Sequence, residues 1–174
     1  MAFVPVVRER GDVSFFGVFD GTVGHDASDF VHNVVVHNML GNDHFTNGVA
    51  AAVSSKRWID PKPVSFFEAA MKHGYKHSDE QLLKYAAEKR LDYSSSTSVT
   101  AFITGDLLTV GHLGDSRIVL GREHAGSGLI GRRLTVDHKP DQAIELKRIQ
   151  SKGGSLTYLH GGKPFIRGGD FTAR

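Results

Sequence analysis

The segment that most constrains the fold is a run of aromatic and β-branched residues, Ser14–Phe19, which stops abruptly at Asp20 and Gly21. A short apolar run bounded by a turn signal predicts a buried β-strand. The carboxylate of Asp20 therefore lies at the end of this strand. Because the strand is apolar, the remaining elements of the fold have to cover it.

Helical periodicity marks three further segments. Asp26 with Asp29 resembles a capping box that opens a first helix. An apolar stripe from Ser65 predicts a long helix to about Arg90, which Gly74 is expected to weaken in its middle. Apolar residues three apart predict a last helix that begins near Ala143 and stops at a glycine pair.

Other stretches predict strands or lack a clear period. Residues 41–63 mix glycine, proline and polar residues and predict a long excursion with one short helix near Val49–Val53. The runs Val99–Ile103 and Leu107–Leu113 flank a turn and predict a hairpin. Arg117–Leu120 is expected to add a third strand, which would make the middle of the chain an antiparallel meander.

The glycine-rich segment Gly121–Gly131 predicts a mobile loop. Ser155–Leu159 and Pro164–Arg167 predict a final hairpin. Helices interleaved with antiparallel strands indicate a layered α+β domain rather than a parallel doubly wound sheet. We interpret residues 1–174 as a single domain, because 40% of them are hydrophobic, enough for one core.

Composition excludes several classes of function. The chain has 21 Lys and Arg against 19 Asp and Glu, without a basic run, so nucleic-acid binding is not indicated. It has no cysteine, which excludes a disulfide framework, a thiolate zinc site and a cysteine nucleophile. No apolar run reaches the roughly 20 residues of a membrane span. We expect an intracellular protein, in the cytoplasm or also the nucleus, and a monomer by default.

Three segments, taken in order, resemble one known family. They are Phe15–Gly21, then Ser94–Val99 together with Val110–Arg117, and finally Leu134–Pro140. Each is similar to a motif of the type 2C protein phosphatases, which are metal-dependent serine/threonine phosphatases. Their shared order across nearly the whole chain makes a chance likeness untenable.

The resemblance implies a sandwich of antiparallel β-sheets flanked by α-helices, in α-β-β-α layers. It also implies a two-metal centre holding Mg²⁺ or Mn²⁺, hard cations that prefer oxygen ligands. By resemblance, Asp20 would bridge the two metals, Gly21 would contribute its carbonyl, and Asp115 would lie near a further, weaker metal. A metal-bridging water would attack phosphoserine or phosphothreonine of a protein substrate without a covalent intermediate.

Structural alternatives stand beside these roles. Asp20 alone is an ordinary strand-end carboxylate, and Asp115 alone makes an Asx-turn next to an ion-paired Arg117. We interpret Asp137–Pro140 as mainly a turn and a helix start, with His138 as an alternative catalytic residue.

The sequence departs from the family directly after the Asp-Gly pair. Family members usually place a histidine there, where it can protonate the leaving alkoxide, but this chain has Thr22. A threonine hydroxyl is too weak an acid for that task. His25 takes the same place if residues 22–24 are an insertion; otherwise it is a solvated histidine near a helix start.

The ends of the chain also lack family motifs. The family's upstream phosphate-binding arginine and metal-binding aspartate have no match before Ser14, and its later aspartates would follow Arg174. We therefore expect the N-terminal and central portion of the catalytic domain, with the metal centre completed by residues outside it. Alone, this portion is expected to be inactive. The alternative is a regulatory or binding module that keeps the phosphatase fold without turnover.

Overall fold

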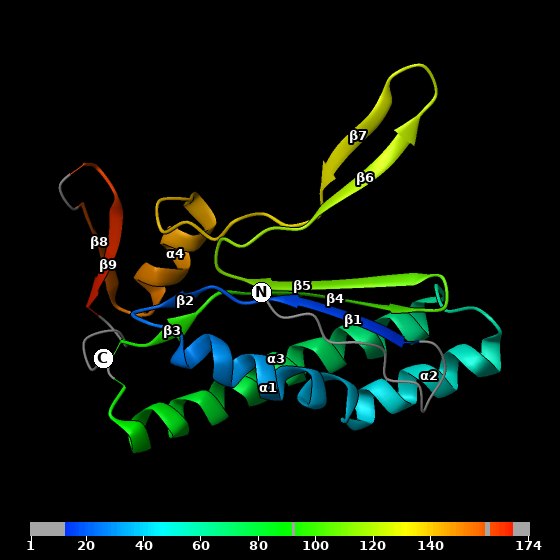
Figure 1. Ribbon diagram of the computed structural model, residues 1–174, viewed down its shortest axis with the longest axis horizontal. Coiled ribbons are helices and arrows are strands. Elements are labelled where there is room, and N and C mark those ends of the chain that lie inside the picture. Colours follow the sequence, from blue (N-terminus) through cyan, green and yellow to red (C-terminus); the bar gives the residue numbers. More distant parts are fainter. Residues whose placement is uncertain (1–12, 92, 159–160, 169–174) are drawn as a thin grey trace.

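The computed structural model describes residues 13–91, 93–158 and 161–168. Three helices lie along one face of a three-stranded sheet, and two hairpins and a fourth helix lie outside this pair of layers (Figure 1). The helices are α1 (Asp26–Leu40), α2 (Asp43–Ser55), α3 (Pro61–Lys89) and α4 (Ala143–Ser151). No helix in these ranges has the length and apolar character needed to cross a bilayer.

All paired strands in the described residues run antiparallel, which confirms the predicted α+β class. The sheet has the order β1-β4-β5, with β1 Val13–Val18, β4 Ser98–Thr104 and β5 Leu107–Leu113. The other pairs are β2 (Gly21–Thr22) with β3 (Ser95–Ser96), β6 (Val119–His124) with β7 (Gly128–Arg133), and β8 (Gly154–Tyr158) with β9 (Pro164–Gly168).

The strand predicted from the aromatic run is β1, and its side chains alternate between two faces. Phe15 is 2% exposed and lies opposite Phe102 of β4, which is fully buried on the helical side. Phe16 and Val18 point the other way, and each is 40% exposed. The period of two along the strand thus separates a helix-covered face from an open face.

An aromatic cluster joins the sheet to the helices. Phe45 of α2, Phe67 of α3 and Phe102 of β4 have ring centroids 5.4 to 5.8 Å apart, and all three are at most 2% exposed. Burial of each such side chain contributes roughly 1.5–3 kcal/mol to folding. The cluster therefore fixes the sheet against the helical layer.

The helix α2 corrects the prediction of a mostly irregular segment. It begins after Asn42, whose side chain accepts a hydrogen bond from the Phe45 N–H at 3.1 Å, so Asn42 is the N-cap. The buried face of α2 includes Gly48 and Ala52, which give almost no apolar periodicity. A Cβ on Gly48 would lie 2.8 Å from the Phe67 ring, so the small residue lets the two helices approach closely.

The helix α3 begins earlier than its apolar stripe indicates. Asp60 is its N-cap and Pro61 its first residue, a position that suits proline because the N–H there has no helical partner. The helix continues unbroken through Gly74, which was expected to weaken it. A Cβ on Gly74 would lie 2.9 Å from the Met39 Cα of α1, so Gly74 permits the contact between these helices.

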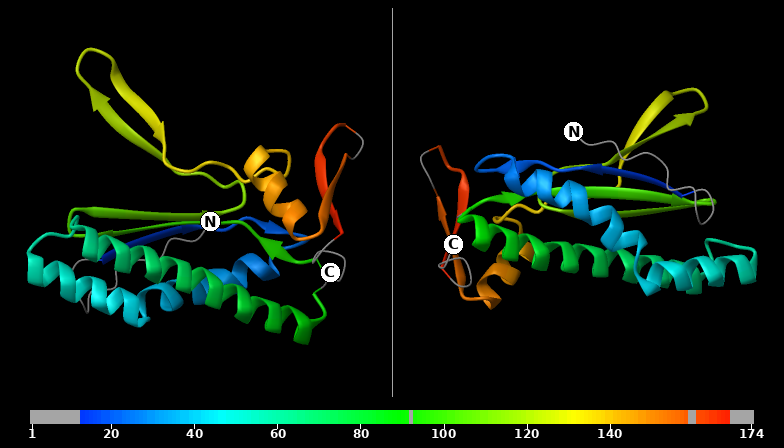
Figure 2. Two further views of the ribbon diagram at one scale, coloured as in Figure 1. Left: turned by 180° about the vertical axis from the view of Figure 1, so that it is seen from behind. Right: turned by 60° about the horizontal axis from the view of Figure 1, so that its bottom comes forward.

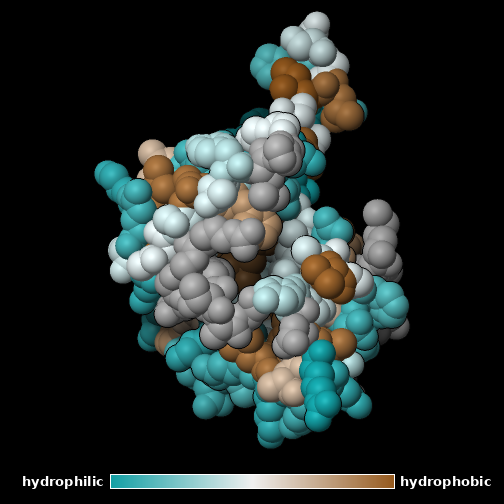
Figure 3. Space-filling view, turned by 90° about the vertical axis from the view of Figure 1, so that its left-hand side faces the viewer, coloured by the Kyte–Doolittle hydropathy of each residue, from teal (hydrophilic) through white to brown (hydrophobic). Residues whose placement is uncertain are grey.

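Two predictions for the middle of the chain are wrong. β6 pairs with β7 and not with β5, so the antiparallel meander is not formed. The predicted mobile loop Gly121–Gly131 is instead most of this β6–β7 hairpin, which turns through Gly126 and Gly128 at φ 84° and 71°. The hairpin projects from the body of the protein, is exposed along both strands, and shows apolar surface (Figures 2 and 3).

The last predicted elements are confirmed. The expected helix is α4, in which Ile149 is 1% exposed, and the expected hairpin is β8–β9. Leu159, the predicted last residue of the first strand of that hairpin, lies outside the described residues.

We predict that Gly74→Ala destabilises the protein, although alanine favours a helix over glycine by about 1 kcal/mol. The added methyl group meets the Met39 backbone, and such overpacking typically costs about 1–3 kcal/mol. Urea denaturation measures the change. Ala87→Gly, at an exposed position of the same helix, is the control for intrinsic propensity. A Gly74→Ala variant more stable than the parent would contradict the close contact.

Candidate active site

Asp20 and Asp115 are brought to the same end of the sheet by Thr97. The Asp20 N–H donates to the Thr97 hydroxyl at 3.1 Å, and the Thr97 N–H donates to the Asp20 carbonyl at 2.9 Å. The Thr97 hydroxyl also shares a hydrogen bond of 2.6 Å with Ser116, the neighbour of Asp115. Thr97 is therefore the structural link between the two predicted carboxylates. The sequence analysis included Thr97 only within the Ser94–Val99 motif and gave it no role of its own.

The Asp20 carboxylate lies exposed beyond the end of β1. Its backbone is held on both sides by Thr97. Within the described residues, no hydrogen bond or ion pair involves its carboxylate oxygens. A fixed backbone with an unpartnered carboxylate is suited to receive a cation.

Gly21 follows Asp20 in a crowded turn. A Cβ at this position would lie 2.8 Å from the Ser28 hydroxyl and 2.5 Å from the Gly24 carbonyl oxygen. The turn into α1 therefore requires glycine here for local steric reasons, whatever the role of the Gly21 carbonyl.

Residues 22–24 turn the chain back toward Gly21. Thr22 is exposed and pairs with Ser95, while Val23 and Gly24 adopt left-handed conformations at φ 57° and 98°. A β-branched residue such as Val23 is strained in this region. The surrounding turn therefore imposes the conformation.

His25 occupies the N-cap of α1, so the predicted capping box at Asp26 is wrong by one residue. Its side chain makes no cap hydrogen bond and is 83% exposed. Instead, the ring Nδ1 lies 2.7 Å from the Asp29 carboxylate. A Cβ on Gly21 would lie 3.3 Å from the His25 Cα, so the turn brings His25 beside the Asp-Gly pair.

Asp115 follows Gly114, which has φ 86°, in the turn after β5. The Lys139 ammonium group forms an ion pair with the Asp115 carboxylate, and both side chains are about half exposed. The turn is held by His138, whose N–H donates to the Gly114 carbonyl at 2.9 Å and whose Nδ1 accepts from the Gly114 N–H at 3.3 Å. His138 therefore supports the Asp115 turn.

Asp137 is held by two arginines and is 8% exposed. Arg117 donates two hydrogen bonds to it, at 3.0 and 2.5 Å, and Arg133 donates one at 2.7 Å. The hydrogen bonds from Arg117 lower the Asp137 pKa from 3.8 to about 2, against the opposing effect of desolvation. These contacts tie together the two ends of the β6–β7 hairpin, a structural role for Asp137.

The donor chemistry fits a metal centre in part. Asp20 offers a carboxylate without a partner among the described residues, and Asp115 offers one that is already paired with Lys139. In the ranges that the structure describes, no group of three or more His, Asp or Glu side chains is arranged to hold a metal ion. The described residues thus supply individual ligands rather than a complete ligand set.

Comparisons with known proteins agree on one family. The sequence model of protein phosphatase 2C matches residues 5–162. Probable protein phosphatase 2C 69 of Arabidopsis thaliana is 34% identical over 146 residues, which are 84% of this chain and 34% of that protein. Probable protein phosphatase 2C 62 of Oryza sativa subsp. japonica is 30% identical, over 92% of this chain and 48% of that protein.

A solved structure extends the agreement to the fold. The crystal structure of serine-threonine phosphatase 2C from Toxoplasma gondii superposes with a TM-score of 0.79 at 42% identity, covering 97% of this chain and 54% of that chain. The chain thus spans about a third and about a half of these two curated relatives, and about half of the solved structure.

The ion pairs of Asp137 predict an acid-dependent stability. Because the pKa of this carboxylate is about 2 in the folded protein, below its ordinary 3.8, its contribution is complete above about pH 4 and is lost as the pH falls through 2. Asp137→Asn should therefore be less stable than the parent at pH 7, and this difference should shrink between pH 4 and pH 2.

Urea denaturation of parent and variant at several pH values measures that difference. Asp141→Asn, which removes an exposed carboxylate nearby, is the control and should show no such pH dependence. A stability difference for Asp137→Asn that stays constant down to pH 2 would refute this role for the arginine contacts.

Proposed function

The chain belongs to the protein phosphatase 2C family, and from that membership we propose that the complete protein hydrolyses phosphoserine and phosphothreonine in intracellular phosphoproteins, using Mg²⁺ or Mn²⁺. The observation that carries the proposal is the Asp20 carboxylate, unpartnered among the described residues and fixed at a sheet end by Thr97.

In this proposal Asp20 and the Gly21 carbonyl would hold the two cations, and Asp115, once released from Lys139, would hold a further, weaker cation. When bound, the cations would acidify the attacking water and neutralise phosphate charge, so that no covalent intermediate is needed. The remaining ligands would come from outside the described residues. Thr97 keeps the Asp20 backbone in position through both of its hydrogen bonds.

The proton for the leaving alkoxide needs a separate donor, and we propose His25. Asp29 binds the ring at Nδ1, which leaves Nε2 for the substrate oxygen. The turn places the His25 backbone beside Gly21, so the intervening residues do not separate them in space. Thr22, although directly next to Gly21, carries only a weakly acidic hydroxyl.

A second candidate function is a phosphatase-like binding module without turnover. Two features favour it: Thr22 stands where the resemblance to the family implies a histidine, and Lys139 is paired with the Asp115 carboxylate. A module of this kind would bind phosphorylated proteins and release no phosphate. The activity measurements below separate the two candidates.

We predict that Asp20→Asn in the complete protein abolishes Mn²⁺-dependent hydrolysis of a phosphopeptide. Metal assistance contributes several kcal/mol to such reactions, so the loss should be at least about 100-fold. The circular dichroism spectrum should not change. Asp106→Asn, an exposed carboxylate in the turn between β4 and β5, is the control and should retain activity. Full activity in Asp20→Asn would refute the metal role, and an inactive parent protein would favour the binding module.

A further prediction concerns the proton donor. His25→Ala should slow hydrolysis of a phosphoserine peptide by roughly 100- to 10,000-fold, the usual contribution of general acid catalysis. Hydrolysis of p-nitrophenyl phosphate should change little, because its leaving group needs little protonation. The control is His124→Ala, an exposed histidine of the β6–β7 hairpin.

If His25→Ala retains its activity on both the phosphoserine peptide and p-nitrophenyl phosphate, His25 is not the acid. A rise in phosphopeptide turnover in Thr22→His would then show that the parent lacks a side-chain acid at this position.

A further inference from the structure

The β6–β7 hairpin stands on a fixed base and is exposed along its length. At the base, the Leu134 N–H donates to the Ile118 carbonyl at 3.0 Å, and the Ile118 N–H donates to the Thr135 hydroxyl at 3.1 Å. Beyond the base, the two strands project from the body of the protein, and every residue of both strands is exposed (Figure 1). A two-stranded hairpin is only marginally stable by itself in water, so a further strand would stabilise it.

The register of the hairpin divides its side chains between two faces, because residues directly opposite each other on antiparallel strands lie on the same face. The first, which we call the glycine face, is made up of Val119, Gly121, Glu123, Leu129, Gly131 and Arg133. The second, which we call the arginine face, is made up of Leu120, Arg122, His124, Ile130 and Arg132.

The glycine face is largely covered by its own side chains. A Cβ on Gly121 would lie 3.3 Å from a methyl group of Leu129, and Val119 lies over the opposite glycine in the same way, at 3.2 Å. The arginine of this face, Arg133, already donates to Asp137 at 2.7 Å. The glycine face therefore has no need of an anionic partner.

The arginine face, in contrast, has two uncompensated positive charges. It carries no acidic side chain, and within the described ranges neither Arg122 nor Arg132 forms an ion pair. The two arginines are diagonal neighbours, a spacing of roughly 7–8 Å that long side chains can bridge. Leu120 and Ile130 beside them are 43% and 46% exposed. This face therefore complements a surface in which carboxylates alternate with apolar side chains.

Both strands of the hairpin also have a free edge. In the part of the chain that the structure describes, β6 pairs only with β7, and β7 only with β6. The outward N–H and C=O groups of either strand can therefore pair with the backbone of an added strand. Alternate side chains of that strand would lie on the arginine face.

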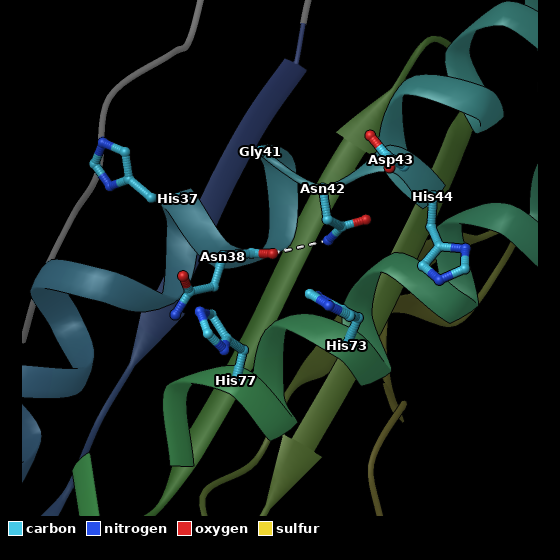
Figure 4. Close-up of a pocket in the computed structure, with 8 residues that line it drawn as sticks. All are labelled: His37, Asn38, Gly41, Asn42, Asp43, His44, His73 and His77. Carbon is cyan, nitrogen blue, oxygen red and sulfur yellow. Dashed lines mark hydrogen bonds between the residues drawn. The ribbon is translucent and has the colours of Figure 1, made fainter. Parts of the chain in front are cut away.

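The hollow where the α1–α2 turn faces α3 gives no comparable sign of a partner (Figure 4). Its amide groups are bonded within the protein: Asn42 donates to the carbonyls of Asn38 and Met39 at 2.8 and 2.9 Å, and Asn38 donates to Ser78 at 2.9 Å. The histidines that line it are not arranged, among the described residues, to hold a metal ion. The unpaired arginines of the hairpin are the stronger indication of a partner.

We propose that the arginine face of the β6–β7 hairpin binds an extended, acidic segment of a partner protein, in which carboxylates alternate with apolar side chains. The segment adds a third strand at a free edge, Arg122 and Arg132 donate to its carboxylates, and its apolar side chains cover Leu120 and Ile130. Arginine suits this role because a guanidinium group can donate two parallel hydrogen bonds to one carboxylate. The interaction does not require phosphate hydrolysis, so it is testable in an active or an inactive protein.

Fluorescence anisotropy with two peptides of equal length tests the proposal. In one peptide glutamate alternates with valine, and in the other glutamine replaces glutamate. The full chain should bind the glutamate peptide at least about tenfold more tightly, because hydrogen bonds to charged groups are stronger, and added salt should reduce the difference. Binding should also slow hydrogen exchange of backbone amides within residues 119–133, where the added strand pairs.

Two double variants locate the binding. Arg122→Gln with Arg132→Gln should abolish the preference for the glutamate peptide and leave the melting temperature unchanged, because both side chains are exposed. Lys89→Gln with Arg90→Gln removes the same charge from the exposed end of α3 and should bind as the parent does.

Three results would overturn the proposal. The parent could bind both peptides equally, or the double arginine variant could keep the preference. Alternatively, the hairpin could bind phosphatidylserine vesicles and not the glutamate peptide, which would make a membrane surface its partner.

Discussion

The rest of the structure depends on the antiparallel pairing of β1 with β4. It joins segments far apart in the chain, in a register that runs from Val13↔Thr104 to Val18↔Val99. Closing a loop of that size costs conformational entropy. Burial of Phe15 and Phe102 between the sheet and the helices offsets that cost. The same pairing sets Asp20 beside Thr97, 77 residues later in the sequence. The helical layer and the candidate active site are thus consequences of one strand pairing.

The sequence predicted those elements whose signal is local. β1, α3 and the β4–β5 hairpin carry strong apolar periodicity or clear turn residues, and the structure confirms them. The full length of α2 could not be predicted, because glycine and alanine on its buried face replace the large residues that make a helix recognisable. The pairing of β6 with β7 was missed for a related reason: glycine marks a flexible loop and a hairpin turn equally well.

For the candidate site, the sequence indicated which types of residue take part. It did not indicate how those residues are arranged in space. A carboxylate at the end of a buried strand is visible in the order of residues around Asp20. The proximity of His25 to Gly21 is not, because it depends on left-handed conformations at Val23 and Gly24 that no local rule predicts for valine. The role of Thr97 was equally hidden, since its partners lie on two distant segments.

Three aspartates of the chain show how charge compensation ranks them as cation ligands. Asp137 is nearly buried and bound by two arginines, so a metal would have to displace both of them to reach its carboxylate. Asp115 is paired with one lysine at an exposed position, where ion pairs contribute only about 0–1 kcal/mol, so a cation at this carboxylate would displace Lys139 at little cost. Asp20 has no such competitor among the described residues. The contacts of the three carboxylates thus rank Asp20, Asp115 and Asp137 in the same order as the roles that we propose for them.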